Sequence, residues 1–305
     1  MNATAAAPIE VDWNHFDPWH VQAVRHRLTD HPLLQSDQLI ALGDRFRCSS
    51  RLFTFSNKAG AGANFDAVSR LYPNTRTVKE SLQNINDAKA WVLLRHVQAD
   101  PVYRPLIDYA LNPIQPEIER KDPGMYYRAG WIFVAAPRTT TPFHIDRNHG
   151  ILLQVRGVKT VYVWDAEDTD VVTDRARDVF HARHDLDLVK WHEEFRERAH
   201  VFKLGPGMGV YIPETCAHMV ETSDEPSTTI SLTYSTNATR RDAMVHVMHD
   251  LMRRKGIEPP EVGKRPILDT LTYAAGSALV AAHAAASRPP ACPSLAHHTP
   301  YAVPD

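Results

Sequence analysis

Residues 131–164 read WIFVAAPRTT TPFHIDRNHG ILLQVRGVKT VYVW, and this stretch decides the fold. It contains four short runs that are rich in β-branched and aromatic residues and are separated by Pro, Gly or Asn, which is typical of strands joined by turns. The segment Arg156-Gly157-Val158 lies between the last two runs and predicts a hairpin turn. The four predicted strands span residues 131–136, 141–146, 151–155 and 159–164.

The same pattern returns after residue 200, where apolar runs are punctuated by Gly205-Pro206-Gly207 and by Pro213. Four more strands are expected at 201–204, 209–212, 218–222 and 228–235. Eight short strands at this spacing predict an antiparallel barrel or a jelly roll of two sheets, so the fold class is mainly β with flanking helices. Residues 174–200, between the two groups, are highly charged and are expected to be a partly helical, solvated insertion.

Helices are predicted on both sides of this core. Asp17-Pro18 is typical of a helix start, and the apolar spacing from Met244 to Met252 marks one face of a helix. The expected helices span 19–28, 35–42, 64–71, 240–255 and 267–285, and two further strands are expected at 51–56 and 90–97.

These assignments divide the chain into four parts. We expect an N-terminal helical region with strands that pack on the barrel (1–129), a catalytic core (130–236), C-terminal helices (237–286) and a disordered tail (287–305).

The composition limits the classes of function. Of the 305 residues, 43% are hydrophobic and 23% are charged, as in an ordinary protein with a core. A net charge of −2 argues against a basic surface for nucleic acid. Three cysteines without a Cys-x-x-Cys spacing favour neither a disulfide framework nor a structural zinc finger. We expect no signal sequence, no membrane span and a cytoplasmic location.

Seventeen histidines invite a search for a metal site. On a strand, residues i and i+2 point to the same side, so a His-x-Asp pair can supply two ligands to one ion. Three such acidic pairs occur: His15/Asp17, His144/Asp146 and His192/Glu194. The first precedes a predicted helix start, and the third lies in a segment of helical composition, where residues two apart diverge by about 200°. Only His144/Asp146 lies on a predicted strand.

A third ligand has to come from a strand far along the chain. His218 follows the apolar strand 209–212 and the turn at Pro213. A single histidine is more often a surface residue or a hydrogen-bonded core residue. Two imidazoles and one carboxylate on one face, however, form the ligand set of mononuclear non-haem iron oxygenases. We therefore predict a metal site of His144, Asp146 and His218.

The residues around these ligands resemble a known family. The hexapeptide Thr141-Pro142-Phe143-His144-Ile145-Asp146, the following stretch 151–159, and the later stretch 201–218 with Gly205-Pro206-Gly207 and Tyr211-Ile212-Pro213 all contribute. Together they resemble the JmjC/cupin-like Fe(II)/2-oxoglutarate-dependent dioxygenases and are similar to the asparaginyl hydroxylases among them. The resemblance covers residues 130–235, and the flanking helices match only in character.

The resemblance implies a double-stranded β-helix, the jelly roll of cupin/JmjC type. It implies that His144, Asp146 and His218 hold Fe(II), and that 2-oxoglutarate and O2 are used to hydroxylate a C–H bond with release of succinate and CO2. By the same motif, Lys159 would bind the distal carboxylate of 2-oxoglutarate, and Thr141 would donate its hydroxyl. A carboxylate that points into the protein needs a cation, which agrees with this role. The alternative for Lys159 is a solubilising residue on an edge strand.

Three positions depart from the pattern of the asparaginyl hydroxylases. Gly150 replaces an amide side chain near the cosubstrate, Thr233 replaces an asparagine, and Met208 replaces an acidic residue after the Pro-Gly turn. None of the three is a predicted metal ligand. Trp131 and Tyr162 are candidates to line the pocket, although ordinary core packing is the better interpretation of both.

Two other functions stay open at this point. One is a non-catalytic cupin-like sensor or regulator that binds a metal, and the other is a metal-dependent cupin enzyme that needs no cosubstrate. The expected partners are a small-molecule or polypeptide substrate, with neither nucleic acid nor membrane. A homodimer through the C-terminal helices is a further hypothesis.

Overall fold

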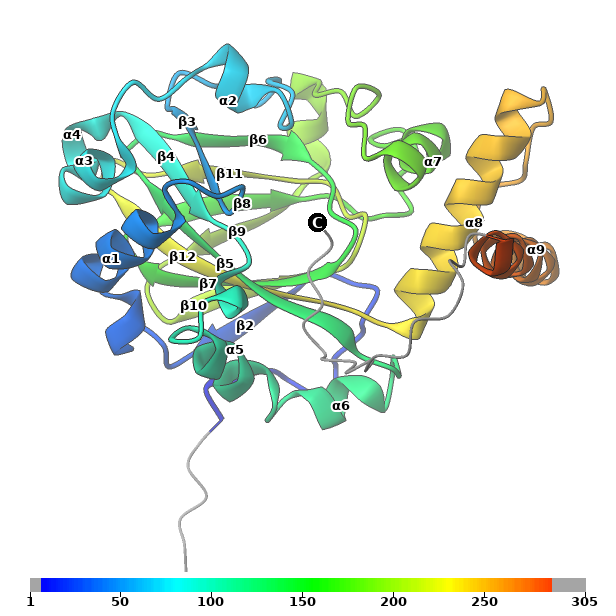
Figure 1. The fold of residues 1–305 in the computed structure, drawn as a ribbon, viewed down its shortest axis with the longest axis horizontal. Coiled ribbons are helices and arrows are strands. Elements are labelled where there is room, and N and C mark those ends of the chain that lie inside the picture. Colours follow the sequence, from blue (N-terminus) through cyan, green and yellow to red (C-terminus); the bar gives the residue numbers. More distant parts are fainter. Residues whose placement is uncertain (1–6, 287–305) are drawn as a thin grey trace, which may run out of the picture.

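The structure is a computed structural model and describes residues 7–286. Two antiparallel sheets pack face to face with helices around them (Figure 1). The larger sheet has the strand order β1-β2-β10-β7-β12-β5-β4-β3, and the smaller has the order β6-β11-β8-β9. The chain therefore has the expected fold class, a jelly roll with flanking helices.

The strands of the larger sheet are β1 (Ile9–Glu10), β2 (Gln22–His26), β3 (Leu52–Ser56), β4 (Ala90–Leu94), β5 (Tyr126–Ala135), β7 (His149–Arg156), β10 (Met208–Ile212) and β12 (Ser227–Ser235). The smaller sheet contains β6 (Thr140–His144), β8 (Lys159–Val163), β9 (His200–Leu204) and β11 (His218–Thr222). All eight strands predicted from residue 131 onward are confirmed, as are the two predicted around residues 51–56 and 90–97.

The α-helices are α1 (Ser36–Phe46), α2 (Val68–Leu71), α3 (Val78–Gln83), α4 (Ile85–Ala88), α5 (Arg104–Leu111), α6 (Gln115–Glu119), α7 (Asp174–Arg183), α8 (Asn237–Arg254) and α9 (Pro266–Ala286). Short 3₁₀ turns, η1 (Pro32–Leu34), η2 (Val97–Ala99) and η3 (Glu193–Arg198), complete the elements.

Each face of the larger sheet has its own apolar layer. On the outer face, α1, α3 and α5 bury leucine and isoleucine side chains against alternate residues of the sheet, such as Val92 and Ile132. On the inner face, Leu152 and Ile212 pack against Val161 and Val220 of the smaller sheet. Neighbouring residues on a strand point to opposite faces, so each strand contributes side chains to both layers. The inner face of the sheet also lines a pocket.

The predicted helix at 19–28 is wrong. This segment forms β2, and Val24 pairs with Gly209 of β10 in an antiparallel register. The pairing is tight, because a Cβ atom at Gly209 would lie 2.9 Å from Cγ2 of Val24. The aspartate and proline that suggested a helix start form a turn instead, so pairing with the sheet overrides the local signal.

The charged segment 174–200 is not the solvated insertion that its composition predicts. Its helix α7 buries Asp178 and Phe180 and packs on α8. The predicted helix at 64–71 is reduced to α2. The predicted C-terminal helices correspond to α8 and α9, while the tail 287–305 lies outside the described residues.

The methionines of α8 pack on α9. A Cβ atom at Gly276 of α9 would lie 2.7 Å from the sulfur of Met244 and 2.9 Å from Cγ of Met248. The two helices therefore form a pair that lies beside the barrel (Figure 1). Within residues 7–286, we find no helix whose length and apolar character would let it cross a membrane.

Candidate metal centre

Two strands of the smaller sheet bring the predicted ligands together. β6 ends at His144 and β11 begins at His218, and the antiparallel register places these two residues opposite each other. Asp146 follows β6 by two residues, and its carbonyl oxygen accepts a hydrogen bond of 2.8 Å from the N–H of Thr215. This bond joins the segment after β6 to the turn before β11, so the three ligands come from adjacent pieces of backbone.

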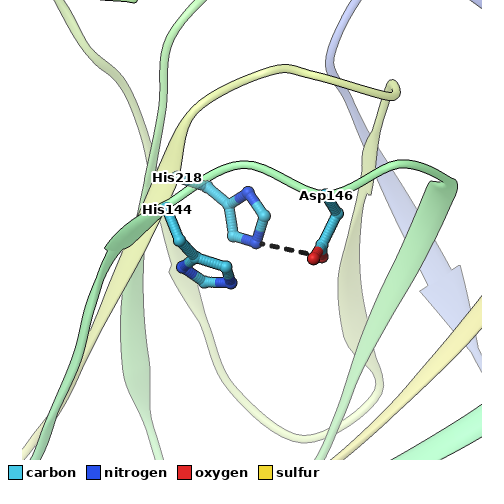
Figure 2. Close-up of side chains that lie close together, drawn as sticks. All are labelled: His144, Asp146 and His218. Carbon is cyan, nitrogen blue, oxygen red and sulfur yellow. Dashed lines mark ion pairs between the residues drawn. The ribbon is translucent and has the colours of Figure 1, made fainter. Parts of the chain in front are cut away.

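The side chains of His144, Asp146 and His218 converge (Figure 2). Their potential ligand atoms all lie within 4.8 Å of one another, and His218 Nε2 is 3.6 Å from Asp146 Oδ2. Ligand atoms on one face of a six-coordinate ion lie about 3 Å apart when each metal–ligand bond is about 2.1 Å. The spacing in the structure therefore needs only small side-chain adjustments to hold an ion.

Backbone carbonyls orient both imidazoles. His144 Nδ1 lies 2.7 Å from the carbonyl oxygen of Pro142, and His218 Nδ1 lies 3.1 Å from that of Cys216. In each case Nδ1–H donates, which leaves the lone pair of Nε2 for a metal. This arrangement fixes the tautomer and the ring direction of both ligands before a metal binds.

Burial makes His144 a neutral ligand. Desolvation, and secondarily the neighbouring His218, lower the pKa of His144 to about 4. The ring of Phe65 stacks on His144 with a centroid distance of 4.3 Å and an interplanar angle of 5°. A neutral imidazole that stacks on an aromatic ring is available for metal binding at neutral pH.

Lys159 and Thr141 line the same pocket as the three ligands. Lys159 lies on β8 with Val161 and Val163 on the same, buried side of the strand, so it is not a surface lysine on an edge. Among the residues that the structure describes, its ammonium has no hydrogen-bond acceptor and no ion pair. Desolvation alone lowers the pKa of Lys159 to about 7. The hydroxyl oxygen of Thr141 accepts a bond of 3.0 Å from Trp91 Nε1, which leaves its proton free to be donated.

None of the other predicted candidates lies among the metal ligands. His15 is exposed and bonds to Asp12, and His192 is exposed as well. Tyr162 points away from the pocket and bonds to Glu221, whereas Trp131 lies on the pocket side of the larger sheet. Phe65 was missed by sequence reasoning, because nothing near it in the chain relates it to His144.

The residues present fit Fe(II) and 2-oxoglutarate. Two imidazoles and one carboxylate that leave one side open form the ligand set of non-haem Fe(II) oxygenases. The buried ammonium of Lys159 lacks a counter-ion in the described part of the chain, and a dicarboxylate bound in this pocket would supply one. Gly150 of β7, which lines this pocket, is paired with Thr233 of β12. Gly150 carries no side chain that would fill the pocket.

Comparisons with known proteins agree with the fold. The family described as the cupin-like domain matches residues 9–240. No curated protein matches the chain. Among solved structures, Escherichia coli ycfD is 14% identical with a TM-score of 0.46, over 89% of this chain and 68% of that chain.

Two further structures show how far the likeness extends. The E. coli ribosomal oxygenase YcfD in complex with cobalt and 2-oxoglutarate is 12% identical with a TM-score of 0.45, over 90% of this chain and 68% of that chain. The DMSP lyase DddQ from Ruegeria pomeroyi is 17% identical with a TM-score of 0.24, over 36% of this chain and 39% of that chain. At these values, the activity of the chain has to follow from its own residues.

Proposed function

The chain belongs to the cupin-like domain family, and on this basis we propose that it is an Fe(II)/2-oxoglutarate-dependent oxygenase that hydroxylates a C–H bond of a small molecule or a polypeptide side chain. The observation that carries the proposal is the position of Lys159. Its buried ammonium lines the same pocket as His144, Asp146 and His218. A buried, unpaired cation is costly, and a dicarboxylate cosubstrate gives it a purpose.

When bound, Fe(II), 2-oxoglutarate and O2 supply the oxidising power for the hydroxylation, with succinate and CO2 as the other products. The protein holds and orients these groups. His144 and His218 present Nε2 because carbonyl oxygens engage Nδ1. Lys159 would bind the distal carboxylate, and Thr141 would donate its hydroxyl to it. Apolar side chains in the pocket wall, including Phe133, Leu152, Ile212 and Val220, exclude water.

Lys159 also separates this function from its two rivals. A sensor that used the metal only for structure would be more stable with an apolar residue at position 159, and so would a metal cupin that needs no cosubstrate. Neither function explains a cation that faces the metal ligands. The proposed oxygenase requires that cation.

The test is binding of 2-oxoglutarate followed by turnover. We would titrate 2-oxoglutarate by calorimetry into the Fe(II)-loaded protein without O2, then admit O2 and measure succinate and the mass gain of one oxygen atom in candidate substrates. Binding should be lost in Lys159→Met and retained in Lys203→Met, a control at an exposed position of β9. Iron content should be equal in both variants.

Each outcome assigns the function. Binding and succinate release that both depend on Lys159 support the oxygenase. Binding without succinate release for any candidate would favour the sensor. Equal affinity in wild type and Lys159→Met would exclude the proposed role of this lysine and with it the proposed function.

A further inference from the structure

The larger sheet carries a second group of polar side chains on its pocket face. Trp131 of β5 is paired with Ser231 of β12, and Ser231 is paired in turn with Leu152 of β7. Ser231 and Leu152 line the pocket that contains the metal ligands. Residues opposite one another in a sheet point to the same side, so Trp131 also points to the pocket side.

One arginine adjoins this tryptophan, and a second lies on the neighbouring strand. The guanidinium carbon of Arg95 lies 5.0 Å from the centroid of the Trp131 ring. Arg95 follows β4 and continues the alternation of Trp91 and Leu93, which pack on the pocket side. The backbone N–H of Arg95 donates a hydrogen bond of 2.7 Å to the backbone carbonyl oxygen of Arg51, which precedes β3. By the same alternation, Arg51 lies on the side of Phe53 and Phe55.

These arginines lie at the end of the sheet where the metal ligands are. β5 begins and β12 ends at this end of the sheet, and Tyr126 is paired there with Ser235. Ser235 accepts a hydrogen bond from Asn148, which lines the metal pocket. Burial is the main cause of a lowered pKa at His184, and Asp146 and Arg95 also act on that pKa with opposite signs. His184 therefore lies near both Asp146 and Arg95.

The donors of this group lack acceptors. Arg51 Nε, Arg95 Nε and Trp131 Nε1 are buried, and within residues 7–286 none of the three atoms has a hydrogen-bond partner. Neither guanidinium forms an ion pair there. The nearby Asp66 forms no ion pair with Arg95 in this part of the chain; burial raises the pKa of Asp66, and Arg95 lowers it to a lesser extent. Buried donors without acceptors are uncommon in folded proteins and call for a ligand.

His96, which lies 5.2 Å from the Trp131 ring, does not supply the missing negative charge. Burial, and secondarily Arg95 and Arg51, lower the pKa of His96 to about 4, so the ring is neutral at neutral pH. Two like charges therefore act on His96 from different sides: the Arg95 guanidinium lies over the Trp131 ring, and the guanidinium carbon of Arg51 lies 6.0 Å from the centroid of the Phe46 ring. This combination matches a carboxylate, which guanidinium groups bind in a bidentate manner, attached to an apolar body that packs on the indole.

We propose that Arg51, Arg95 and Trp131 form a subsite that binds a carboxylate of the substrate, so that a neighbouring C–H bond faces the metal ligands. The inference rests on the proposed function, because it names the substrate class of that same site. The subsite is distinct from Lys159, which belongs to β8 of the opposite sheet. The carboxylate can belong to a free acid or to an acidic side chain of a peptide.

The test compares acids with their neutral amides. One arm uses 3-phenylpropanoate and 3-phenylpropanamide, and the other uses a capped Gly-Gly-Asp-Gly-Gly peptide and its Asn counterpart. Binding to the full chain is measured by calorimetry with Zn(II) and saturating 2-oxoglutarate, which occupy the metal positions and Lys159. The series is repeated in Lys159→Met without either addition, so that the result does not depend on 2-oxoglutarate binding.

In at least one arm, the acid should bind about tenfold or more tightly than the amide, because hydrogen bonds to charged groups are the stronger ones. This preference should be lost in Arg95→Gln and in Arg51→Gln, weakened in Arg95→Lys, and unchanged in Arg76→Gln, a control at an exposed position. Thermal unfolding of each variant checks its folding. The variants Arg95→Lys and Trp131→Phe keep the test meaningful if a glutamine variant is unstable.

Equal binding of acid and amide in both arms would overturn the proposal, and so would a preference that survives in the Arg51→Gln/Arg95→Gln double variant. If the preference holds in Lys159→Met while wild type fails to bind 2-oxoglutarate, the subsite stands and the proposed oxygenase function falls. If wild type binds 2-oxoglutarate but no acid is preferred, the subsite falls while the proposed oxygenase function stands.

Discussion

Burial of Lys159 determines its charge state and how much its charge lowers the stability of the folded protein. Its pKa is lowered from 10.5 to about 7, so between these values the unfolded state holds a proton that the folded state lacks. The stability of the wild type should therefore rise with pH from about 7 to 10.5 as far as this group is concerned. At and below pH 7 the folded protein carries the full cost of a buried cation.

Lys159→Met should remove that cost. We expect the free energy of unfolding to increase by about 1–4 kcal/mol at pH 7, because the replacement is apolar and of similar size. The gain should shrink as the pH rises toward 10.5. Urea unfolding of both proteins at pH 7 and pH 9.5, without metal or cosubstrate, measures this difference. A variant less stable than wild type at pH 7 would show that Lys159 has a partner that stabilises it.

The same residue predicts how 2-oxoglutarate affinity depends on pH. Above about pH 7, Lys159 is neutral in the free protein, so binding of a dicarboxylate has to take up a proton. Affinity should fall by up to about tenfold per pH unit above that value. Calorimetry at pH 8 in two buffers of different ionisation enthalpy should report uptake of close to one proton. Identical heats in the two buffers would contradict this account.

At the residue scale, sequence reasoning found the three ligands and Lys159 because metal chemistry restricts residue type and strand geometry restricts spacing. His144 and Asp146 are two apart, and His218 follows a turn before a strand. Arg51 and Arg95 have no such signature. They become neighbours only through the pairing of β3 with β4.

At the scale of elements, strands between Pro and Gly turns could be predicted, whereas elements fixed by distant partners could not. β2 contains a pattern that is compatible with a helix, and pairing with β10 decides its conformation. The charge of α7 suggested a solvated segment. The helix instead buries Asp178, which is fully inaccessible, against α8. Composition cannot reveal that a buried carboxylate has hydrogen-bond donors on another helix.

Asp178 should therefore hold α7 to α8. It accepts hydrogen bonds of 2.7 Å from His246 Nδ1 and 2.8 Å from Arg253 Nε. Asp178→Ala leaves both donors buried without this carboxylate, and we expect a loss of about 3–5 kcal/mol in urea unfolding. Hydrogen exchange of α8 amides should accelerate.

A matched control for this substitution is Asp170→Ala. Asp170 is 81% exposed and pairs with Arg198, so its removal should cost less than about 1 kcal/mol. Equal losses in the two variants would mean that the Asp178 cluster does not stabilise the helix pair.

At the scale of the whole molecule, the metal centre lies where β6 ends and β11 begins. The α8–α9 pair lies beside the jelly roll (Figure 1). The barrel and the site could be predicted from one stretch of about a hundred residues, because every ligand and most core strands lie within it. The packing of α8 on α9 could not be predicted in this way. It depends on the fit of two methionines around Gly276.

The exposed apolar side chains of α9 lead to a prediction about the assembly of the protein. Ile267, Leu271, Leu279 and Val280 are 80%, 64%, 57% and 56% exposed. Several large apolar side chains exposed along one helix favour association, because burying them removes apolar surface from water. We therefore expect a homodimer through the C-terminal helices, with a dimer mass in light scattering at micromolar concentration.

Leu271→Glu together with Leu279→Glu should give a monomer, since both charges would be buried at the interface. Leu188→Glu, at a 44% exposed position outside α9, should leave the mass unchanged. A wild-type protein of monomer mass would show that α9 does not mediate self-association.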